Sequence, residues 1–270
     1  MLAIFTASML IACGNSKKNS SQIENISLSG STSMEKTIGG LSEAFMIEHP
    51  DISITYEPTG SSAGITSVLE NTADIGLSSR ELKPSETGIT PIVVAYDGII
   101  IIVHKDNPIK NLTTDKVKSL FNGEVTNWQD VGGLDLPVVP IGREAGAGTR
   151  DGFESVLGLA DTAAYQQELI STGAILAGVS SNKNAIGYIS FASAKNNVNV
   201  VSLDEVAPSK ETILDGSYTL RRSFLLLVND NTQLSVPAKA FLEFATSPEA
   251  NDIISSTGVI PVNIGDTNEK

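Results

Sequence analysis

The sequence has very few of the residues from which most catalytic and metal sites are built. It contains one cysteine, Cys13, and two histidines, His49 and His104, among 270 residues. A disulfide within the chain is therefore excluded, and so is a cysteine- or histidine-rich metal site, so we expect no metal and no cofactor. Neither histidine has a recognisable catalytic spacing, and an enzyme would need an activated nucleophile or a metal. We therefore disfavour enzymatic function.

Positive charge is also scarce. The chain carries 18 Lys and Arg against 31 Asp and Glu, a net charge of -13. Such a chain is a poor general binder of nucleic acid, which proteins hold with Lys and Arg. It also repels small anions at long range, so any anion must be attracted by a local site. The composition, 41% hydrophobic and 18% charged, is that of a globular protein with one large domain or two modest ones.

The N-terminus has the pattern of a secretion signal. Residues 2–12 are apolar or small, a run that is too short to span a bilayer. The tetrapeptide at positions 10–13 resembles a bacterial lipobox, which implies a signal peptide over residues 1–12 and lipidation of Cys13. Residues 13–25 then form a polar, flexible tether. No Lys or Arg precedes the apolar run, as such signals usually require, and a buried free cysteine in an N-terminal strand or helix is the alternative.

Beyond residue 25, strand and helix patterns alternate. Residues 26–29, 52–56 and 73–77 read as strands, and the apolar residues near positions 34–45 and 65–69 fall on helical faces. This rhythm predicts an α/β fold with a mostly parallel sheet and helices on both faces. Further helices are expected at 114–121 and 238–254, and further strands at 137–141 and 185–190. Pro248 breaks the second of these helices, and we expect it in the first turn of a new helix.

Two apolar stretches, 89–103 and 223–228, read as crossovers between two lobes. Asp97 and Gly98 interrupt the first stretch, and we expect hinge motion near residues 96–98 and 220–222. The only tryptophan, Trp128, is expected to be a packing anchor.

Four segments share one design, in which a strand is followed by a loop of small or hydroxyl residues and then by a helix. Such loops offer unpaired N–H groups, a positive helix-dipole end and uncharged hydroxyl donors, and an arginine adds a fork for an oxyanion. They would meet where open α/β sheets bind ligands, at the carboxyl ends of the strands. The segments are 29–35, in which Thr32 and Glu35 have capping-box spacing, 59–64, 77–81 and 142–151.

Each loop also has a purely structural interpretation. Serine and threonine before a helix usually act as caps, and an arginine beside them usually forms a surface salt bridge. The combination is more informative, because three of the five arginines, Arg80, Arg143 and Arg150, lie in or beside these loops.

From about residue 26 to residue 261, the sequence resembles the phosphate-binding proteins of bacterial phosphate-specific ABC importers. The resemblance implies a two-lobed periplasmic-binding-protein fold of type II, with two hinge crossovers and the ligand in the interlobe cleft. It places lobe 1 at 26–97 plus 221–270 and lobe 2 at 98–220. The matching motifs are SGST at 29–32, GSSAG at 60–64, DIGLSSR at 74–80, NWQDVGG at 127–133, residues 143–149, AIGYI at 185–189, FLEF at 241–244 and SPEA at 247–250.

The resemblance also implies which residues bind the ligand. The expected ligand-binding residues are Thr32, Ser33, Ser61, Ser79, Arg143, Ala147, Gly148 and Thr149, and Ser31, Ser62, Arg80, Asp97 and Asp151 are further candidates. Two positions depart from the family pattern. Ala147 replaces a serine, and Ser79 stands where some members carry an aspartate that accepts the ligand's proton. Asp97 or Asp151 could supply that acceptor, although Asp97 could equally shape a hinge turn and Asp151 cap a helix.

These features predict a lipid-anchored protein on the extracytoplasmic face of the bacterial cell membrane. It would capture inorganic phosphate as a monomer and deliver it to the membrane permease of an ABC importer, without binding nucleic acid. The alternatives are another tetrahedral oxyanion such as sulfate or molybdate, a surface adhesin on the same scaffold, and, least favoured, a phosphohydrolase.

Overall fold

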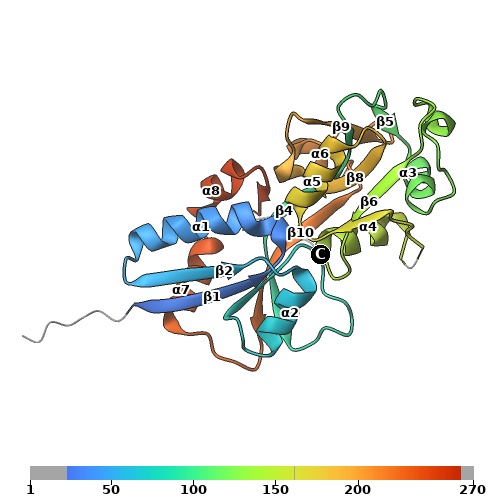
Figure 1. Ribbon diagram of the computed structural model, residues 1–270. Coiled ribbons are helices and arrows are strands. Elements are labelled where there is room, and N and C mark those ends of the chain that lie inside the picture. The colour runs from blue at the N-terminus through green and yellow to red at the C-terminus, as the bar shows by residue number, and fades with distance from the viewer. Residues whose placement is uncertain (1–22, 161, 263–270) are drawn as a thin grey trace, which may run out of the picture.

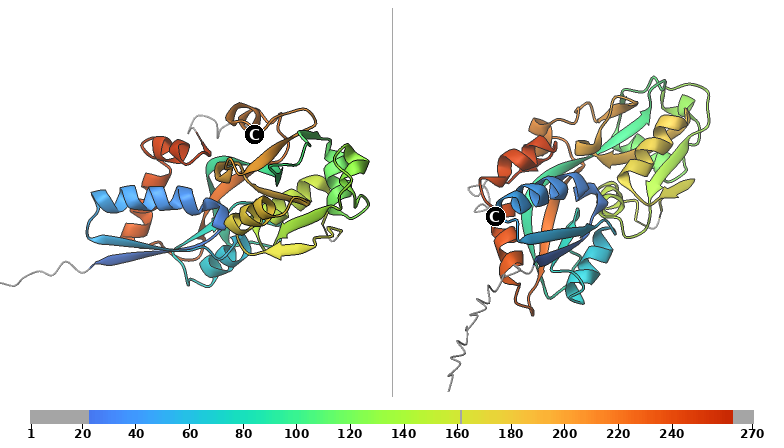
Figure 2. Two further views of the ribbon diagram at one scale, coloured as in Figure 1. Left: turned by 45° about the horizontal axis from the view of Figure 1, so that its top comes forward. Right: turned by 60° about the vertical axis from the view of Figure 1, so that its left-hand side comes forward.

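The computed structural model describes residues 23–160 and 162–262, which form two α/β lobes joined by two long strands (Figure 1). Cys13, the expected signal peptide and most of the expected tether lie outside the described residues. The views in Figure 2 show the same two bodies meeting along one side. No helix of the described ranges is long and apolar enough to cross a membrane.

The first lobe is a sheet with helices on both faces, as predicted. Buried side chains of β1, β3 and alternate residues of the second crossover pack against α1, α7 and α8, and the intervening residues pack against α2. Its elements are β1 (Glu24–Gly30), η1 (Thr32–Met34), α1 (Glu35–Glu48), β2 (Ile52–Glu57), α2 (Ser61–Leu69), β3 (Ile75–Ser78), α7 (Val236–Ala245), α8 (Ala250–Ser256) and β11 (Ile260–Pro261).

The second lobe has one continuous core on which the remaining helices pack. Thr113 caps the first of these, α3, by accepting a hydrogen bond from the backbone N–H of Lys116, and Ser171 caps α5 in the same way. The elements of this lobe are β5 (Asn111–Leu112), α3 (Thr114–Phe121), η2 (Trp128–Val131), β6 (Val139–Arg143), α4 (Gly148–Leu157), β7 (Gln167–Leu169), α5 (Thr172–Ser181), β8 (Ala185–Ser190), η3 (Phe191–Ser193), β9 (Val198–Leu203) and α6 (Lys210–Leu214).

The two crossovers are β4 (Ile89–His104) and β10 (Arg221–Asn229), which pair with each other in antiparallel register. Asp97 and Gly98 interrupt the apolar sequence of β4, and the strand itself runs unbroken through both residues. The sheet order is β2-β1-β3-β10-β4-β8-β6-β7. The outer strands of each lobe pair in parallel, as expected. The expectation does not hold for the middle of the sheet, because one crossover runs into the second lobe and the other runs back, so these two strands are antiparallel.

The predicted core faces are confirmed. Ile38, Leu41 and Phe45 on one side of α1, and Met34 at the end of η1 directly before it, are all at most 1% exposed. Each contributes about 1.5–3 kcal/mol by leaving water. Trp128 is buried as expected, and its indole N–H donates to the backbone oxygen of Asn184 at 3.0 Å.

The C-terminal helical segment is two helices that are separated near Pro248, as expected. Pro248 lies in the turn between α7 and α8, two residues before α8 begins, and therefore outside the first helical turn in which it was expected. The proline in a first helical turn is Pro237 of α7.

Candidate functional site

The four predicted loops converge between the lobes. β1, β3 and β6 end at Gly30, Ser78 and Arg143, and the helices that follow, α2 and α4, begin at Ser61 and Gly148. The first three loops belong to lobe 1 and the fourth belongs to lobe 2, so the cluster forms only where the lobes touch.

The two lobes approach so closely here that one position requires glycine. A Cβ on Gly148 would lie 2.2 Å from Ser61 Oγ and 2.6 Å from Ser79 Oγ, closer than side-chain carbons come to other atoms. The backbone N–H of Ser62 also donates to the carbonyl oxygen of Gly146 across the interface at 3.1 Å. Backbone from lobe 2 therefore reaches the hydroxyl groups of lobe 1 directly.

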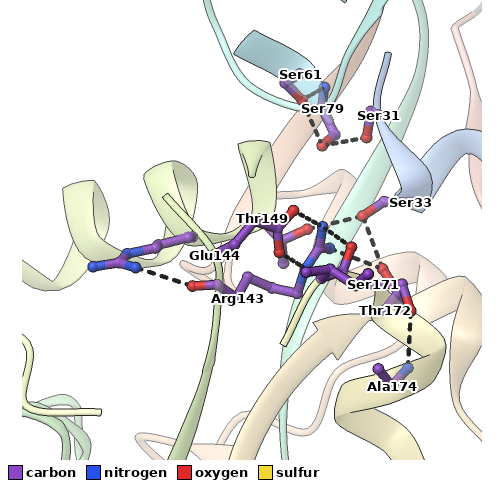
Figure 3. Close-up of polar contacts among 12 residues, drawn as sticks. Ser31, Ser33, Ser61, Ser79, Arg143, Glu144, Thr149, Ser171, Thr172 and Ala174 are labelled. Carbon is purple, nitrogen blue, oxygen red and sulfur yellow. Dashed lines mark hydrogen bonds and ion pairs between the residues drawn. The ribbon is translucent and has the colours of Figure 1, made fainter. Parts of the chain in front are cut away.

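The hydroxyl groups of three serines of lobe 1 form a buried cluster on one side of this contact, which we call the hydroxyl cluster (Figure 3). Ser31 Oγ donates to Ser79 Oγ at 2.7 Å, and the backbone N–H of Ser79 donates to Ser61 Oγ at 3.1 Å. All three are at most 2% exposed, so an oxyanion bound here would be shielded from water.

Ser33 links lobe 1 to lobe 2. Its hydroxyl shares hydrogen bonds with Thr149 Oγ1 at 2.8 Å and with Thr172 Oγ1 at 3.3 Å (Figure 3). Thr172 is the first residue of α5 and was missed in the sequence, although the Ser-Thr pair before an apolar helix at 171–172 is the same signal that identified the other loops.

Thr32 does not form the predicted capping box. It lies in the short helix η1, and α1 begins only at Glu35, so the spacing that suggested a cap is a turn too early. Its Oγ1 is buried and has no hydrogen-bond partner within residues 23–160 and 162–262. An unpaired buried hydroxyl costs stability, and a ligand that accepts a hydrogen bond from this hydroxyl would remove that cost.

Arg143 is buried, and a neighbouring carboxylate holds its guanidinium. Nε and Nη2 donate to Glu144 at 2.9 and 2.7 Å, and Nη1 donates to Thr172 Oγ1 at 3.3 Å (Figure 3). The backbone N–H of Arg143 donates to the hydroxyl of Tyr188, whose pKa burial raises to about 12, so that this hydroxyl is neutral. The carboxylate fixes one edge of the guanidinium and leaves Nη1 among the hydroxyls.

A second buried arginine, Arg222, reaches the same hydroxyls. It lies directly opposite Asp97 in the β10–β4 ladder, and its Nε and Nη2 donate to Asp97 Oδ2 at 3.1 and 2.8 Å. Its Nη1 donates to Ser79 Oγ at 3.2 Å and to Thr149 Oγ1 at 2.7 Å. Residues 220–222 were expected to act as a hinge only. The sequence signal that could have identified Arg222 was an arginine at the start of one apolar crossover and an aspartate within the other.

Arg80 and Asp151, two of the further candidates, pair with each other. Arg80 Nε lies 2.7 Å from Asp151 Oδ2, and its Nη atoms donate to Glu86 at 2.8 and 2.7 Å, which lowers the pKa of Glu86. Lys83 Nζ lies 3.3 Å from the same Asp151 oxygen, and Arg80 Nη2 donates to Ser62 Oγ at 3.1 Å. These groups join the lobes by charge at the edge of the hydroxyl cluster.

The remaining predicted residues take their places through the backbone. Ala147 is the N-cap of α4 and is 1% exposed, and no side chain caps the helix start. No side chain therefore accepts a hydrogen bond from the first N–H groups of α4. These N–H groups and the positive end of the helix dipole face the cluster and are available to an anion. The assembled site therefore offers two kinds of donor. One kind is uncharged hydroxyl and N–H groups, and the other is guanidiniums that are each held by a carboxylate. Among the described residues, no three His, Cys, Asp or Glu side chains gather in a group that could hold a metal ion.

Comparison with known proteins agrees with this geometry. A substrate-binding protein from Clostridium perfringens, solved with bound phosphate, is 38% identical, with a TM-score of 0.86 over 89% of this chain and 100% of that chain. An ABC-type phosphate transport receptor from Vibrio cholerae is 33% identical, with a TM-score of 0.75 over 87% of this chain and 99% of that one.

Curated sequences point the same way. The phosphate-binding protein PstS of Borreliella burgdorferi is 28% identical over 276 residues, which cover 97% of each chain. A sequence model of the PBP superfamily domain matches residues 15–249. The two-lobed fold, the interlobe loops and these matches together establish that this chain belongs to the PBP superfamily of binding proteins, among the phosphate-binding members.

Proposed function

We propose that this chain captures inorganic phosphate outside the cytoplasm and hands it to the membrane permease of an ABC importer. One observation carries the proposal: buried hydroxyls from both lobes converge with the free edge of a clamped guanidinium, Arg143. Such donors bind a tetrahedral oxyanion through charge-assisted hydrogen bonds and without proton transfer. The relatives named for phosphate binding, one solved with phosphate, support this choice of anion.

The proposed ligand groups come from both lobes. Lobe 1 supplies the hydroxyls of Thr32, Ser33, Ser61 and Ser79, and Ser31 supports Ser79. Lobe 2 supplies Arg143, the hydroxyl of Thr149, and the N–H groups of Ala147, Gly148 and Thr149 at the start of α4. The hydrogen bonds that these hydroxyls now make to one another would be exchanged for bonds to the anion. Breaking a neutral bond costs about 1 kcal/mol, and the charge-assisted bond that replaces it contributes about 1.5–3 kcal/mol.

Isothermal titration of the purified protein with phosphate, arsenate and sulfate tests the proposal. We expect heat with phosphate and with its mimic arsenate, and none with sulfate. Absence of heat with all three anions would refute the function and favour an adhesin on the same scaffold. Sulfate binding as tightly as phosphate would refute the selectivity alone. Release of phosphate from its esters would indicate an enzyme instead of a binder.

The lobe boundaries belong to the same proposal. Lobe 1 would comprise 26–97 plus 221–270, lobe 2 would comprise 98–220, and the hinge would lie where Asp97 and Arg222 pair. The separate hydrophobic cores on either side of this pair support that division. Closure about the hinge, in a protein acting as a monomer, would bury the anion.

A lipid anchor at Cys13 completes the proposed function, since a receptor tethered at the membrane stays near its permease. Mass spectrometry of the protein extracted from bacterial membranes should find Cys13 N-terminal and carrying a diacylglyceryl group. A Cys13→Ser variant should leave the membrane fraction. An unmodified Cys13 within a longer membrane-associated chain would contradict the anchor.

A further inference from the structure

Two buried arginines in this protein are presented in the same way. Arg143 donates with Nε and Nη2 to Glu144, and Arg222 donates with Nε and Nη2 to Asp97. In each case the carboxylate occupies one edge of the guanidinium and leaves Nη1 for other partners. A planar guanidinium held in this way can still make a charge-assisted hydrogen bond with its remaining edge.

The free edges of both arginines reach one connected set of hydroxyls, in which Ser33 bonds to both Thr149 and Thr172. Arg143 Nη1 reaches Thr172 in lobe 2, whereas Arg222 Nη1 reaches Ser79 in lobe 1 and Thr149 in lobe 2. Arg222 is therefore the one of the two that touches hydroxyls of both lobes, and it does so from the crossover strand.

The two guanidiniums also interact electrostatically. Burial lowers the pKa of Arg222, the nearby charge of Arg143 lowers it further, and Asp97 offsets part of both effects. Two cations held close together away from water repel, and an anion between them relieves that repulsion. Asp97 offsets this repulsion only in part, and it occupies Nε and Nη2 of Arg222, so Nη1 is the edge that an anion could take.

We infer that Arg222 is a second anion-binding guanidinium of this site, directed by Asp97 and engaged when the two lobes close. The inference rests on the proposed phosphate function. It assigns to Asp97 a positioning role, because its Oδ2 holds Nε and Nη2 of Arg222. Its Oδ1 is buried and has no hydrogen-bond partner among the described residues, so the role of proton acceptor considered from the sequence stays a separate prediction. With Ser79 as a neutral neighbour, the charge in this half of the site comes from Arg222.

The sharpest test removes the buried pair together. In Asp97→Leu/Arg222→Met, apolar side chains replace both charges, a change that buried ion pairs often tolerate. We expect a folded protein, by circular dichroism and thermal unfolding, that binds inorganic phosphate about 10- to 100-fold more weakly by isothermal titration, the effect of losing one charge-assisted hydrogen bond or two.

A second variant guards against misfolding of the first. Arg222→Lys keeps a charge for Asp97, but an ammonium held there has no second edge to offer, so we expect a loss of about 10-fold. The matched control is Arg221→Met, because Arg221 is exposed and donates to the backbone oxygen of Leu214, outside the cluster. It should bind like the unaltered protein.

The outcomes separate the inference from the function on which it rests. If the unaltered protein binds no phosphate, the proposed function fails. If it binds phosphate, and either folded Arg222 variant binds equally well, Arg222 and Asp97 are only a structural pair and the inference is overturned. Weakened binding in the folded Arg222 variants, with Arg221→Met unaffected, supports it.

Discussion

The two lobes touch through two contacts of different chemistry. The inner contact consists of hydroxyls, Ser33 with Thr149 and Thr172, and the arginines behind them. The outer contact consists of charges, Arg80 with Asp151 and Glu86, and Lys83 beside them. In the outer contact every positive charge has a carboxylate partner, whereas the inner hydroxyls bond mainly to one another.

This difference indicates which contact a ligand can enter. Exchanging one neutral hydrogen bond for another costs about 1 kcal/mol or less, whereas leaving a buried charge unpaired costs several kcal/mol. An anion can therefore replace hydroxyl–hydroxyl bonds in the inner contact, and the outer contact can hold the lobes together while it does so. The following predictions test that division of labour, beginning with the largest effect.

Arg143→Ala should weaken phosphate binding the most. It removes the Nη1 donor and its charge from the inner contact, and it leaves Glu144 facing the anion without a cation between them. We expect a loss of about 100-fold or more, measured by isothermal titration. Arg221→Ala, at an exposed arginine, is the control. A loss below about 3-fold would mean that the inner contact does not bind the anion through Arg143.

Gly148→Val should prevent the inner contact from closing. Its side chain would overlap Ser61 Oγ and Ser79 Oγ, and overpacking of a tight contact costs about 1–3 kcal/mol, or about 10- to 100-fold in affinity. X-ray scattering at saturating phosphate should find a larger radius of gyration than for the unaltered protein. Gly39→Ala, on a part of α1 where an added Cβ meets nothing within 4 Å, is the control. An unchanged radius and affinity would exclude direct packing of the lobes at Gly148.

Asp151→Asn should have a smaller effect. It removes the interlobe charge of the outer contact, but Arg80 keeps its bond pair to Glu86. A partly exposed ion pair contributes about 1 kcal/mol, so titration should find phosphate binding weakened about 5-fold, and less so at high salt. Asp252→Asn, on the surface of α8, is the control. A loss as large as that of Arg143→Ala would show that the outer contact touches the ligand.

Ala147→Ser should change affinity the least. The backbone at Ala147 has the extended N-cap conformation, φ -75° and ψ 122°, without a side-chain cap. A serine there can accept from an N–H of the first turn, which stabilises the fold by about 1 kcal/mol in thermal unfolding. Its hydroxyl is then engaged with the helix, and titration should find affinity within about 3-fold of the unaltered protein. A gain above 10-fold would show that the missing hydroxyl limits binding.

Local pattern predicted most of the elements. The helix at 114–121 and the strand at 185–190 have the predicted bounds, and the apolar spacing at positions 34–45 predicted which side of α1 is buried. These features depend on side chains close together in sequence, whose period follows from helix and strand geometry. The capping-box spacing of Thr32 and Glu35 is also a local pattern, and the helix start that it predicted was wrong.

The sequence by itself determined the two-lobed α/β fold, the loops that carry hydroxyls, and Arg143 as a cation among them. Only the tertiary structure decided which charges meet. Asp97 faces Arg222 because β4 and β10 pair in one register, and Asp151 meets Arg80 because the lobes come together. These partners lie 125 and 71 positions apart, as their residue numbers give, so no local spacing links them. Electrostatic interactions depend on distance in space, and packing of whole strands and lobes sets that distance.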